Sequence, residues 1–263
     1  MSSGSIRDGG RPRRSAPAAR PAPAALPAPA VAGPSRTGLL LAAIGLAGLG
    51  LLAATGIAQA LAPASPASPF DGPLADCRVG DRLTPHRGPG DWSRTLLDQE
   101  YALAADDVPP DLVSLADRGI DGPGALRSFV LDDLSAMLED ARDADAAFRV
   151  TSTYRSHQHQ VRTFASLEAE YGLDEALRSA ARPGHSEHQL GTTIDVEGGE
   201  AWLAANARRY GFVMSYPAEH SPRTTCYKPE PWHFRYVGRD AARAVDRSGL
   251  SLRAWLWQRQ ADD

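Results

Sequence analysis

The stretch Gly-His-Ser-Glu-His-Gln-Leu-Gly-Thr-Thr-Ile-Asp, residues 184–195, is the most informative part of this 263-residue chain. It ends in a segment rich in β-branched residues, Thr192–Val196, which predicts a strand. Gly191 allows the chain to turn between His188 and that strand, which presents Asp195 from one of its faces. The pattern therefore predicts a turn and a strand that carry one imidazole and one carboxylate.

A second stretch, Glu-Pro-Trp-His-Phe-Arg-Tyr at residues 230–236, contains a further imidazole at the start of another predicted strand. A catalytic zinc site needs three nitrogen or oxygen ligands and an open position for water. His188, Asp195 and His233 offer two imidazoles and one carboxylate. Glu230 is placed to act as general base on the water, whose pKa zinc lowers towards ~7. The spacing alone leaves open that both histidines are satisfied polar residues at strand ends.

A third motif lies upstream and has the pattern Ser-x-Tyr-Arg-Ser, with a Gln four residues after the last Ser. It is matched by Ser152, Tyr154, Arg155, Ser156 and Gln160. The three motifs together resemble the zinc D-alanyl-D-alanine carboxypeptidases of the vancomycin-resistance (VanY) type and their LD-carboxypeptidase relatives. That group has Ser-x-His-x-x-Gly-x-Ala-x-Asp followed by Glu-Pro-Trp-His. The resemblance extends from about Leu96 to Arg247, and it departs from the pattern at Thr193, where the group has alanine.

The resemblance implies a role for each matching residue. His188, Asp195 and His233 would hold zinc, and Glu230 would activate the water. Arg155 would stabilise the oxyanion of the tetrahedral intermediate or hold the acyl carbonyl of the substrate. The residues implied to bind the peptide and its terminal carboxylate are Tyr154, Ser156, Gln160, Ser186 and Trp232. We expect His185 to be a loop residue, or a residue that supports a ligand, rather than a fourth ligand.

The resemblance implies a zinc metallocarboxypeptidase that removes the C-terminal D-Ala from peptidoglycan stem peptides. Three alternatives remain open: an LD-carboxypeptidase, a wall endopeptidase, and a non-catalytic domain that binds wall peptide. A serine enzyme of the penicillin-binding type is excluded, because its Ser-x-x-Lys motif needs a serine three residues before a lysine. The only lysine is Lys228, and Thr225 occupies that position.

Charge divides the chain near residue 70. Residues 1–70 carry six arginines and one acid, a net charge of +5, whereas the remaining residues carry −9. The negative part argues against a nucleic-acid partner, since phosphate binding needs a basic face. Residues 1–37 are rich in Pro, Ala and Arg and hold too little apolar surface to offset the entropy of ordering. We expect them to form a disordered cytoplasmic arm.

Residues 38–62 are predicted to be a membrane segment. Within them, Gly38–Ile57 is a run of 20 almost entirely apolar residues, which as a helix spans the ~30 Å of a bilayer's hydrocarbon core. Arginines flank it only on the N-terminal side, which places the N-terminus in the cytoplasm and the rest outside. We expect a single-pass anchor in the cell membrane, because the run exceeds the about 7–15 apolar residues of a signal peptide. Secretion after cleavage within residues 58–62 is the alternative.

The outer part of the chain is predicted to be an α+β domain with a small antiparallel sheet flanked by helices that carries the zinc site. We expect a linker and lead-in over residues 63–95, the carboxypeptidase domain over 96–250, and a C-terminal helix and tail over 251–263. Periodicity predicts helices over 125–142, 157–171, 174–181, 200–210, 240–246 and 252–258. It predicts strands over 148–153, 192–196, 212–216 and 233–237. We expect a monomer.

The chain has two cysteines, Cys77 and Cys226, and both lie beyond the predicted membrane segment. In an oxidising compartment, an even pair of cysteines predicts one disulfide. Metal ligation by these residues is disfavoured, because neither has a second cysteine near it in the sequence. The pair therefore predicts a bridge between the start of the domain and a loop 149 residues later. Two unpaired thiols are the alternative.

Overall fold

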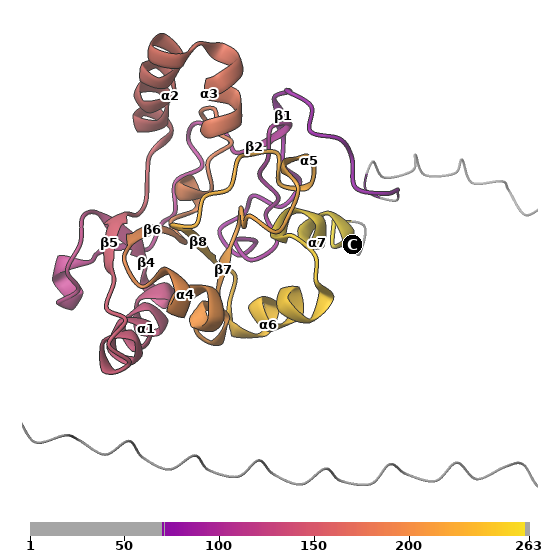
Figure 1. The fold of residues 1–263 in the computed structure, drawn as a ribbon. Helices are drawn as coiled ribbons and strands as arrows, with labels where there is room; N and C mark the ends of the chain where they lie inside the picture. Colours follow the sequence, from indigo (N-terminus) through magenta and orange to yellow (C-terminus); the bar gives the residue numbers. More distant parts are fainter. Residues whose placement is uncertain (1–69, 71, 261–263) are drawn as a thin grey trace, which may run out of the picture. The chain divides into compact units, whose positions relative to one another are not determined.

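Four short antiparallel strands form the largest sheet in the described part of the chain, which is residue 70 and residues 72–260 of this computed structural model (Figure 1). Their order is β5 (Arg149–Ser152), β6 (Thr193–Glu197), β8 (His233–Tyr236) and β7 (Phe212–Met214). Helices lie on both sides of this sheet. The predicted α+β class with a small antiparallel sheet is therefore confirmed.

The register between β6 and β8 separates their side chains onto two faces. Asp195 lies opposite His233, and Ile194 lies opposite Phe234. Successive side chains of a strand point to opposite faces, so Asp195 and His233 share one face while Ile194 and Phe234 share the other. Ile194 and Phe234 are buried in the main hydrophobic core. One face thus forms the core, and the other face is left to carry polar groups.

Helix α1 (Leu131–Asp143) contributes the largest helical part of the main core. Its buried residues Leu131, Leu134, Met137 and Ala141 recur every three or four positions, so they lie on one side of the helix. Helix α4 (Glu200–Asn206) and the 3₁₀ turn after it (Ala207–Tyr210) add to the same core. In Figure 1, α1 and α4 lie on the opposite side of the sheet from α2 and α3.

The prediction of one helix over residues 125–142 was wrong at its beginning. Ala125–Arg127 forms strand β4, which pairs with β3 (Leu112–Ser114), and the 3₁₀ turn Ser128–Val130 then leads into α1. The backbone of this segment finds its hydrogen-bond partners in a strand that the local sequence does not reveal. Tertiary pairing therefore overrides the helical period of the apolar residues.

The remaining predicted helices are confirmed with small shifts at their ends. They are α2 (His157–Tyr171), α3 (Leu173–Ser179), α6 (Arg239–Ser248) and α7 (Leu252–Gln258). Short elements complete the described chain: β1 (Arg82–Leu83), β2 (Tyr101–Ala102), α5 (Pro222–Thr225) and the 3₁₀ turns η1 (Ala116–Arg118) and η3 (Glu187–Leu190). Ser156 caps α2, since its Oγ accepts a hydrogen bond from the His159 N–H at 3.2 Å.

The described part of the predicted lead-in packs against the domain. Phe70 is buried with its ring centroid 4.8 Å from that of Trp257 on α7 and 5.2 Å from that of Tyr101. Strand β1 pairs in parallel with β2. Phe70, Leu74 and Ala75, from the segment that we expected to be a linker and lead-in, thus contribute to a second core cluster that includes α7.

The predicted arm and membrane segment lie outside the described residues. Within residues 70 and 72–260, no helix is both long enough and apolar enough to span a bilayer. The predictions for residues 1–37 and 38–62 therefore stay predictions.

The predicted disulfide between Cys77 and Cys226 is present, with the two Cα atoms 5.3 Å apart. Cys226 ends α5 and immediately precedes Tyr227, a buried residue whose ring lies 5.1 Å from that of Tyr216. The bridge therefore connects the lead-in to the segment that leads to Glu230.

Removing this bridge should destabilise the protein without changing its fold. The two cysteines are 149 residues apart, and a cross-link that closes so long a loop contributes about 3–5 kcal/mol in the loop-entropy treatment. We expect the double variant Cys77→Ser, Cys226→Ser to lose that much free energy of unfolding, measured by urea denaturation. Dithiothreitol should lower the midpoint of the wild type but leave that of the variant unchanged. Equal midpoints for oxidised wild type and variant would contradict the expectation.

Candidate metal centre and active site

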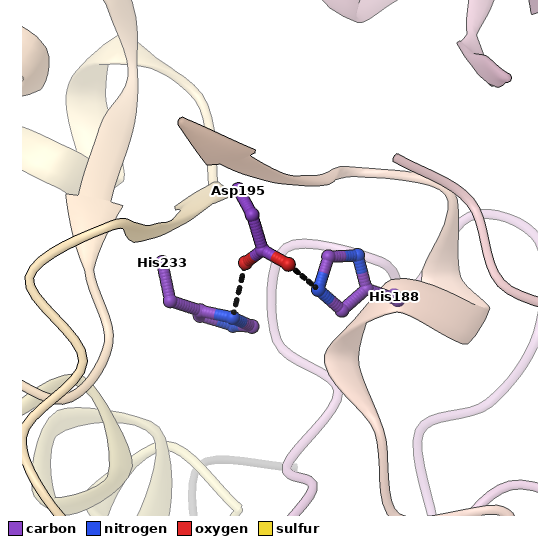
Figure 2. A group of neighbouring side chains, drawn as sticks. All are labelled: His188, Asp195 and His233. Carbon is purple, nitrogen blue, oxygen red and sulfur yellow. Dashed lines mark hydrogen bonds and ion pairs between the residues drawn. The ribbon is translucent and has the colours of Figure 1, made fainter. Parts of the chain in front are cut away.

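His188, Asp195 and His233 meet on the polar face of the sheet (Figure 2). Their potential ligand atoms all lie within 4.8 Å of one another. His188 Nε2 is 3.2 Å from Asp195 Oδ2, and His233 Nδ1 is 3.1 Å from Asp195 Oδ1. The two imidazole rings are nearly perpendicular, with centroids 5.0 Å apart. The structure thus brings together all three residues that the sequence predicted as ligands.

The turn η3 places His188 beside the strand that carries Asp195. It ends at Gly191, whose φ of +68° is a left-handed conformation that favours glycine. A Cβ at this position would lie 2.8 Å from a methyl carbon of Leu112 and 3.1 Å from Cγ of Arg127. Both the backbone conformation and the lack of space therefore require glycine here, as the sequence pattern predicted.

Hydrogen bonds leave one nitrogen of each histidine facing the cluster. His188 Nδ1 lies 2.7 Å from the carbonyl oxygen of Thr153, which can only accept, so Nδ1 carries the proton and Nε2 keeps its lone pair. His233 Nε2 lies 3.0 Å from a carboxylate oxygen of Glu187, and Nδ1 faces Asp195. Two imidazole nitrogens and a carboxylate are ligands that zinc prefers. The donor set on this face therefore fits a zinc ion.

The electrostatics of the cluster favour a positive charge at its centre. Burial opposes ionisation of Asp195, but the adjacent imidazoles of His188 and His233 outweigh it and lower the pKa of the carboxyl. Burial likewise opposes a charge on His233, yet its hydrogen bonds to Asp195 and Glu187 prevail and raise its pKa to about 10. A metal ion at this position would have to displace that proton, and the carboxylates that stabilise the proton would then face the cation.

Glu230 lies beside His233 and has an unusual acidity. Its Oε2 is 3.5 Å from His233 Nδ1. Desolvation by burial raises the pKa of Glu230 to about 7, against the opposing effect of His233. A carboxyl group whose pKa is close to neutral can both accept and return a proton at physiological pH. This is the property required of the general base that the sequence predicted.

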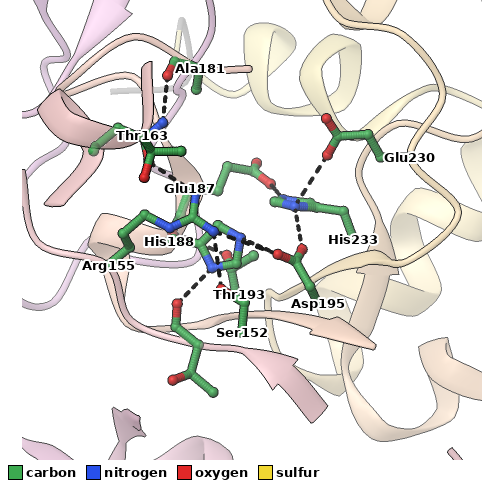
Figure 3. Close-up of polar contacts among 12 residues, drawn as sticks. Ser152, Arg155, Thr163, Ala181, Glu187, His188, Thr193, Asp195, Glu230 and His233 are labelled. Carbon is green, nitrogen blue, oxygen red and sulfur yellow. Dashed lines mark hydrogen bonds and ion pairs between the residues drawn. The ribbon is translucent and has the colours of Figure 1, made fainter. Parts of the chain in front are cut away.

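Arg155 reaches the cluster from the loop between β5 and α2 (Figure 3). Its Nη2 donates to Ser152 Oγ at 3.0 Å and lies 3.7 Å from Asp195 Oδ2, while Nη1 donates to Gln160 Oε1 at 3.0 Å. Burial lowers the pKa of Arg155, although Asp195 and Glu230 oppose that shift. The guanidinium is therefore held in position by polar partners at the edge of the metal ligands.

The three ligands, Glu230 and Arg155 line one cavity of about 180 Å³. Helices α2 and α3 supply part of its wall, and Trp232, 46% exposed, lies at its rim. Ser186 and Gln160 also line it. The Gln160 amide already has partners, because Oε1 accepts from Arg155 and Nε2 donates to the carbonyl of Ala181 at 2.6 Å.

Two residues that the sequence implied as substrate ligands do not line this cavity. Ser156 caps α2 instead, and Tyr154 is half-buried outside the cavity wall. The His185 side chain contacts other residues. Its Nδ1 lies 2.7 Å from the carbonyl oxygen of Asp98, and its Nε2 lies 3.3 Å from a carboxylate oxygen of Asp81. It is a loop residue, as expected.

The sequence did not predict a role for Glu187, which is buried next to His233. Glu187, 4% exposed, accepts hydrogen bonds from Ser215 Oγ at 2.6 Å and Arg235 Nη1 at 2.9 Å. Burial opposes its ionisation, but Arg235 and His233 outweigh that effect and lower the pKa of Glu187 to about 2. A signal was available, because Arg235 follows His233 by two positions and so shares its face of the strand.

Comparison with known proteins identifies the family. A family model described as "VanY: D-alanyl-D-alanine carboxypeptidase" matches residues 124–239. A D-alanyl-D-alanine carboxypeptidase of Enterococcus faecalis is 35% identical over 187 residues, which cover 63% of this chain and 66% of that protein. The bifunctional D-Ala-D-Ala dipeptidase and carboxypeptidase VanXYC of Enterococcus gallinarum is 34% identical over 162 residues, 54% of this chain and 82% of that protein. The chain belongs to the VanY family.

Solved structures of this family share the fold. A vancomycin-resistance D,D-pentapeptidase VanY in complex with Zn(II) is 30% identical, with a TM-score of 0.56, and the match covers 63% of this chain and 99% of that one. The LD-carboxypeptidase LdcB is 27% identical, with a TM-score of 0.57, over 63% of this chain and 87% of that one. In this member of the VanY family, His188, Asp195 and His233 form a group that could hold a zinc ion. It spans about two thirds of the E. faecalis relative.

Loss of the central carboxylate should remove the metal. We expect Asp195→Asn to retain well under one zinc per chain after dialysis, because the neutral amide removes the negative charge that both histidines face. Zinc content is measured by atomic emission on folded, dialysed protein. His185→Gln is the matched control and should keep one zinc per chain. Retention of stoichiometric zinc by Asp195→Asn would show that another group provides the third ligand.

Proposed function

We propose that this chain is a D-alanyl-D-alanine carboxypeptidase that removes the C-terminal D-Ala from peptidoglycan stem peptides. The observation that carries the proposal is one cavity that contains the His188, Asp195 and His233 cluster together with Glu230 and Arg155. The D-alanyl-D-alanine carboxypeptidase of E. faecalis supports the choice of substrate. A cavity of about 180 Å³ suits the end of a peptide rather than a folded protein chain.

Glu230 would manage the protons of the reaction. When bound at such a site, zinc acts as a Lewis acid and lowers the pKa of a coordinated water to about 7. The Glu230 carboxylate, whose pKa is about 7, would accept a proton from the attacking water. It would then return this proton to the nitrogen of the departing D-Ala. Its position beside His233 keeps it within reach of the metal ligands.

Arg155 would stabilise the negative charge that develops on the scissile carbonyl oxygen. A guanidinium offers several fixed donors, and Arg155 uses Nη1 and Nη2 to hold Gln160 and Ser152. These contacts hold the guanidinium beside Asp195, so that it does not have to reorganise when the charge forms. In this proposal Gln160 acts through Arg155, and Ser186 and Trp232 contribute to the cavity wall around the peptide.

An LD-carboxypeptidase is the second candidate, because LdcB shares the fold with a similar TM-score. The two activities differ in the configuration of the residue before the scissile bond, which the walls of the cavity must accommodate. Muramyl pentapeptide and tetrapeptide distinguish them. Release of D-Ala from the pentapeptide alone supports the proposed D,D activity, and release from the tetrapeptide alone supports the second candidate.

Removal of the general base should abolish the reaction while leaving the metal bound. We expect Glu230→Ala to lower kcat/KM for D-Ala release from muramyl pentapeptide by about 10²–10⁴-fold. The zinc content should stay near one per chain, because Glu230 is not one of the three ligands. Glu219→Ala, at an exposed position, is the control and should leave the rate unchanged. Wild-type rates in Glu230→Ala would refute the proposed proton transfer, and chelator-resistant activity would refute the dependence on zinc.

We also propose that the enzyme is held at the outer face of the cell membrane by residues 38–62. The apolar run Gly38–Ile57 and the arginines before it support this topology. The Cys77–Cys226 disulfide supports an oxidising compartment. We expect the protein to remain in the membrane pellet after carbonate extraction with an uncleaved N-terminus. A soluble protein that begins within or shortly after residues 58–62 would support secretion instead.

A further inference from the structure

A buried ion pair lies directly behind the metal ligand His233. Glu187 and Arg235 have side chains that are 4% and 0% exposed, and Glu187 Oε1 accepts from Arg235 Nη1 at 2.9 Å. The other oxygen, Oε2, accepts from Ser215 Oγ at 2.6 Å and lies 3.0 Å from His233 Nε2. Figure 3 shows the Glu187 carboxylate pointing at the His233 ring from the side away from Asp195.

The pair is anchored to a distant part of the chain. Arg235 Nη2 donates to the carbonyl oxygens of Trp92 at 2.8 Å and Thr95 at 2.7 Å. The guanidinium is therefore fixed between the lead-in and Glu187, and Glu187 is fixed between Arg235 and His233. Arg235 and His233 are two positions apart on β8, so their side chains lie on the same face of the strand. Both side chains can therefore contact Glu187.

Stability alone gives no reason for this arrangement. Desolvating a carboxylate and a guanidinium costs several kcal/mol, and well-packed apolar residues in place of a buried ion pair are often equally stable or more so. A carboxylate behind a metal-bound imidazole has a specific effect instead. It accepts the proton of the distal nitrogen, fixes the ring orientation and makes the proximal nitrogen a better ligand.

We propose that Glu187, held by Arg235, is a positioning residue of the zinc site that fixes the proton of His233 on Nε2 and directs Nδ1 at the metal. The inference rests on the zinc site of the proposed function. The two histidines then differ in how they are oriented. The backbone carbonyl of Thr153 holds His188, whereas a side chain holds His233. A side-chain substitution can therefore remove the hydrogen bond that orients His233, but not the backbone hydrogen bond that orients His188.

The test is the zinc affinity of Glu187→Gln, measured in full-length protein by competition with a chromophoric chelator. Glutamine keeps the size of the side chain but replaces one acceptor oxygen with a donor. It cannot accept from both Arg235 and His233, so one of the two contacts is lost. We expect the zinc dissociation constant to rise by about 10–100-fold. A change of less than about threefold in a folded Glu187→Gln variant would overturn the proposal.

A spectroscopic measurement separates positioning from general loss of packing. In zinc-loaded protein labelled with ¹⁵N-histidine, we expect the wild-type His233 ring to show a slowly exchanging Nε2 proton. Glu187→Gln should lose that slow exchange, while the His188 Nδ1 proton, held by the Thr153 carbonyl, keeps it. If the Nε2 proton of His233 stayed equally protected in the variant, Glu187 would not be its partner and the proposal would fail.

The matched control is Asp98→Asn. Asp98 and Arg253 form a second buried carboxylate–guanidinium pair, with Nε and Oδ2 2.7 Å apart and side chains 2% and 5% exposed. The Asp98 carboxylate contacts Arg253 on α7 and the backbone N–H of Glu100 rather than a metal ligand. We expect Asp98→Asn to lower the melting temperature yet keep the zinc dissociation constant within about threefold of wild type. A loss of zinc affinity equal to that of Glu187→Gln would mean that any damage to a buried pair weakens the site, and the proposal would fall.

A double variant keeps the test decisive if Glu187→Gln does not fold. Glu187→Met combined with Arg235→Met leaves no unpaired charge in the interior, so we expect a folded protein. Its zinc affinity should still fall, because His233 has lost its acceptor; affinity equal to wild type would overturn the proposal. These measurements use no substrate. A protein that binds zinc as expected but releases no D-Ala would therefore refute the proposed function and leave the role of Glu187 intact.

Discussion

Asp195 lies opposite His233 across the antiparallel pairing of β6 with β8, and the active site depends on that register. A shift by one residue would move Asp195 into the core and bring Ile194 to the polar face. The register is held by the apolar face, where Ile194 and Phe234 are buried beneath helix α1 in one cluster. The hydrophobic core on the other face of the sheet therefore positions Asp195 and His233.

The buried charged groups around His233 partly neutralise one another. Asp195, Glu187 and Glu230 all face the ring of His233, and Arg235 and Arg155 partly neutralise them. At low dielectric, such a group of carboxylates is stable only with a cation among them. The same environment that favours zinc also desolvates Glu230 and raises its pKa to about 7. The proposed metal binding and the proposed proton transfer thus share one electrostatic origin.

Segments distant in sequence complete the site. Arg235 is held by carbonyls of Trp92 and Thr95, and the disulfide joins Cys77 to the segment before Glu230. The lead-in is therefore part of the folded domain and contributes to the surroundings of the metal ligands. This explains why its described part is packed against α7 rather than extended as a linker.

The sequence by itself predicted the three candidate metal ligands, the candidate general base and most of the helices and strands. Each is encoded in a local pattern, such as His188-x₆-Asp195 or Gly191 at a left-handed turn. It did not reveal strand β4, the packing of the lead-in, or the contact of Glu187 with His233. These depend on partners that are remote along the chain, such as β3 for residues 125–127 and Arg235 for Glu187. Only the tertiary structure decided them. Glu187 can contact His233 only because the fold brings the Arg235 guanidinium to one of its carboxylate oxygens and the His233 imidazole to the other.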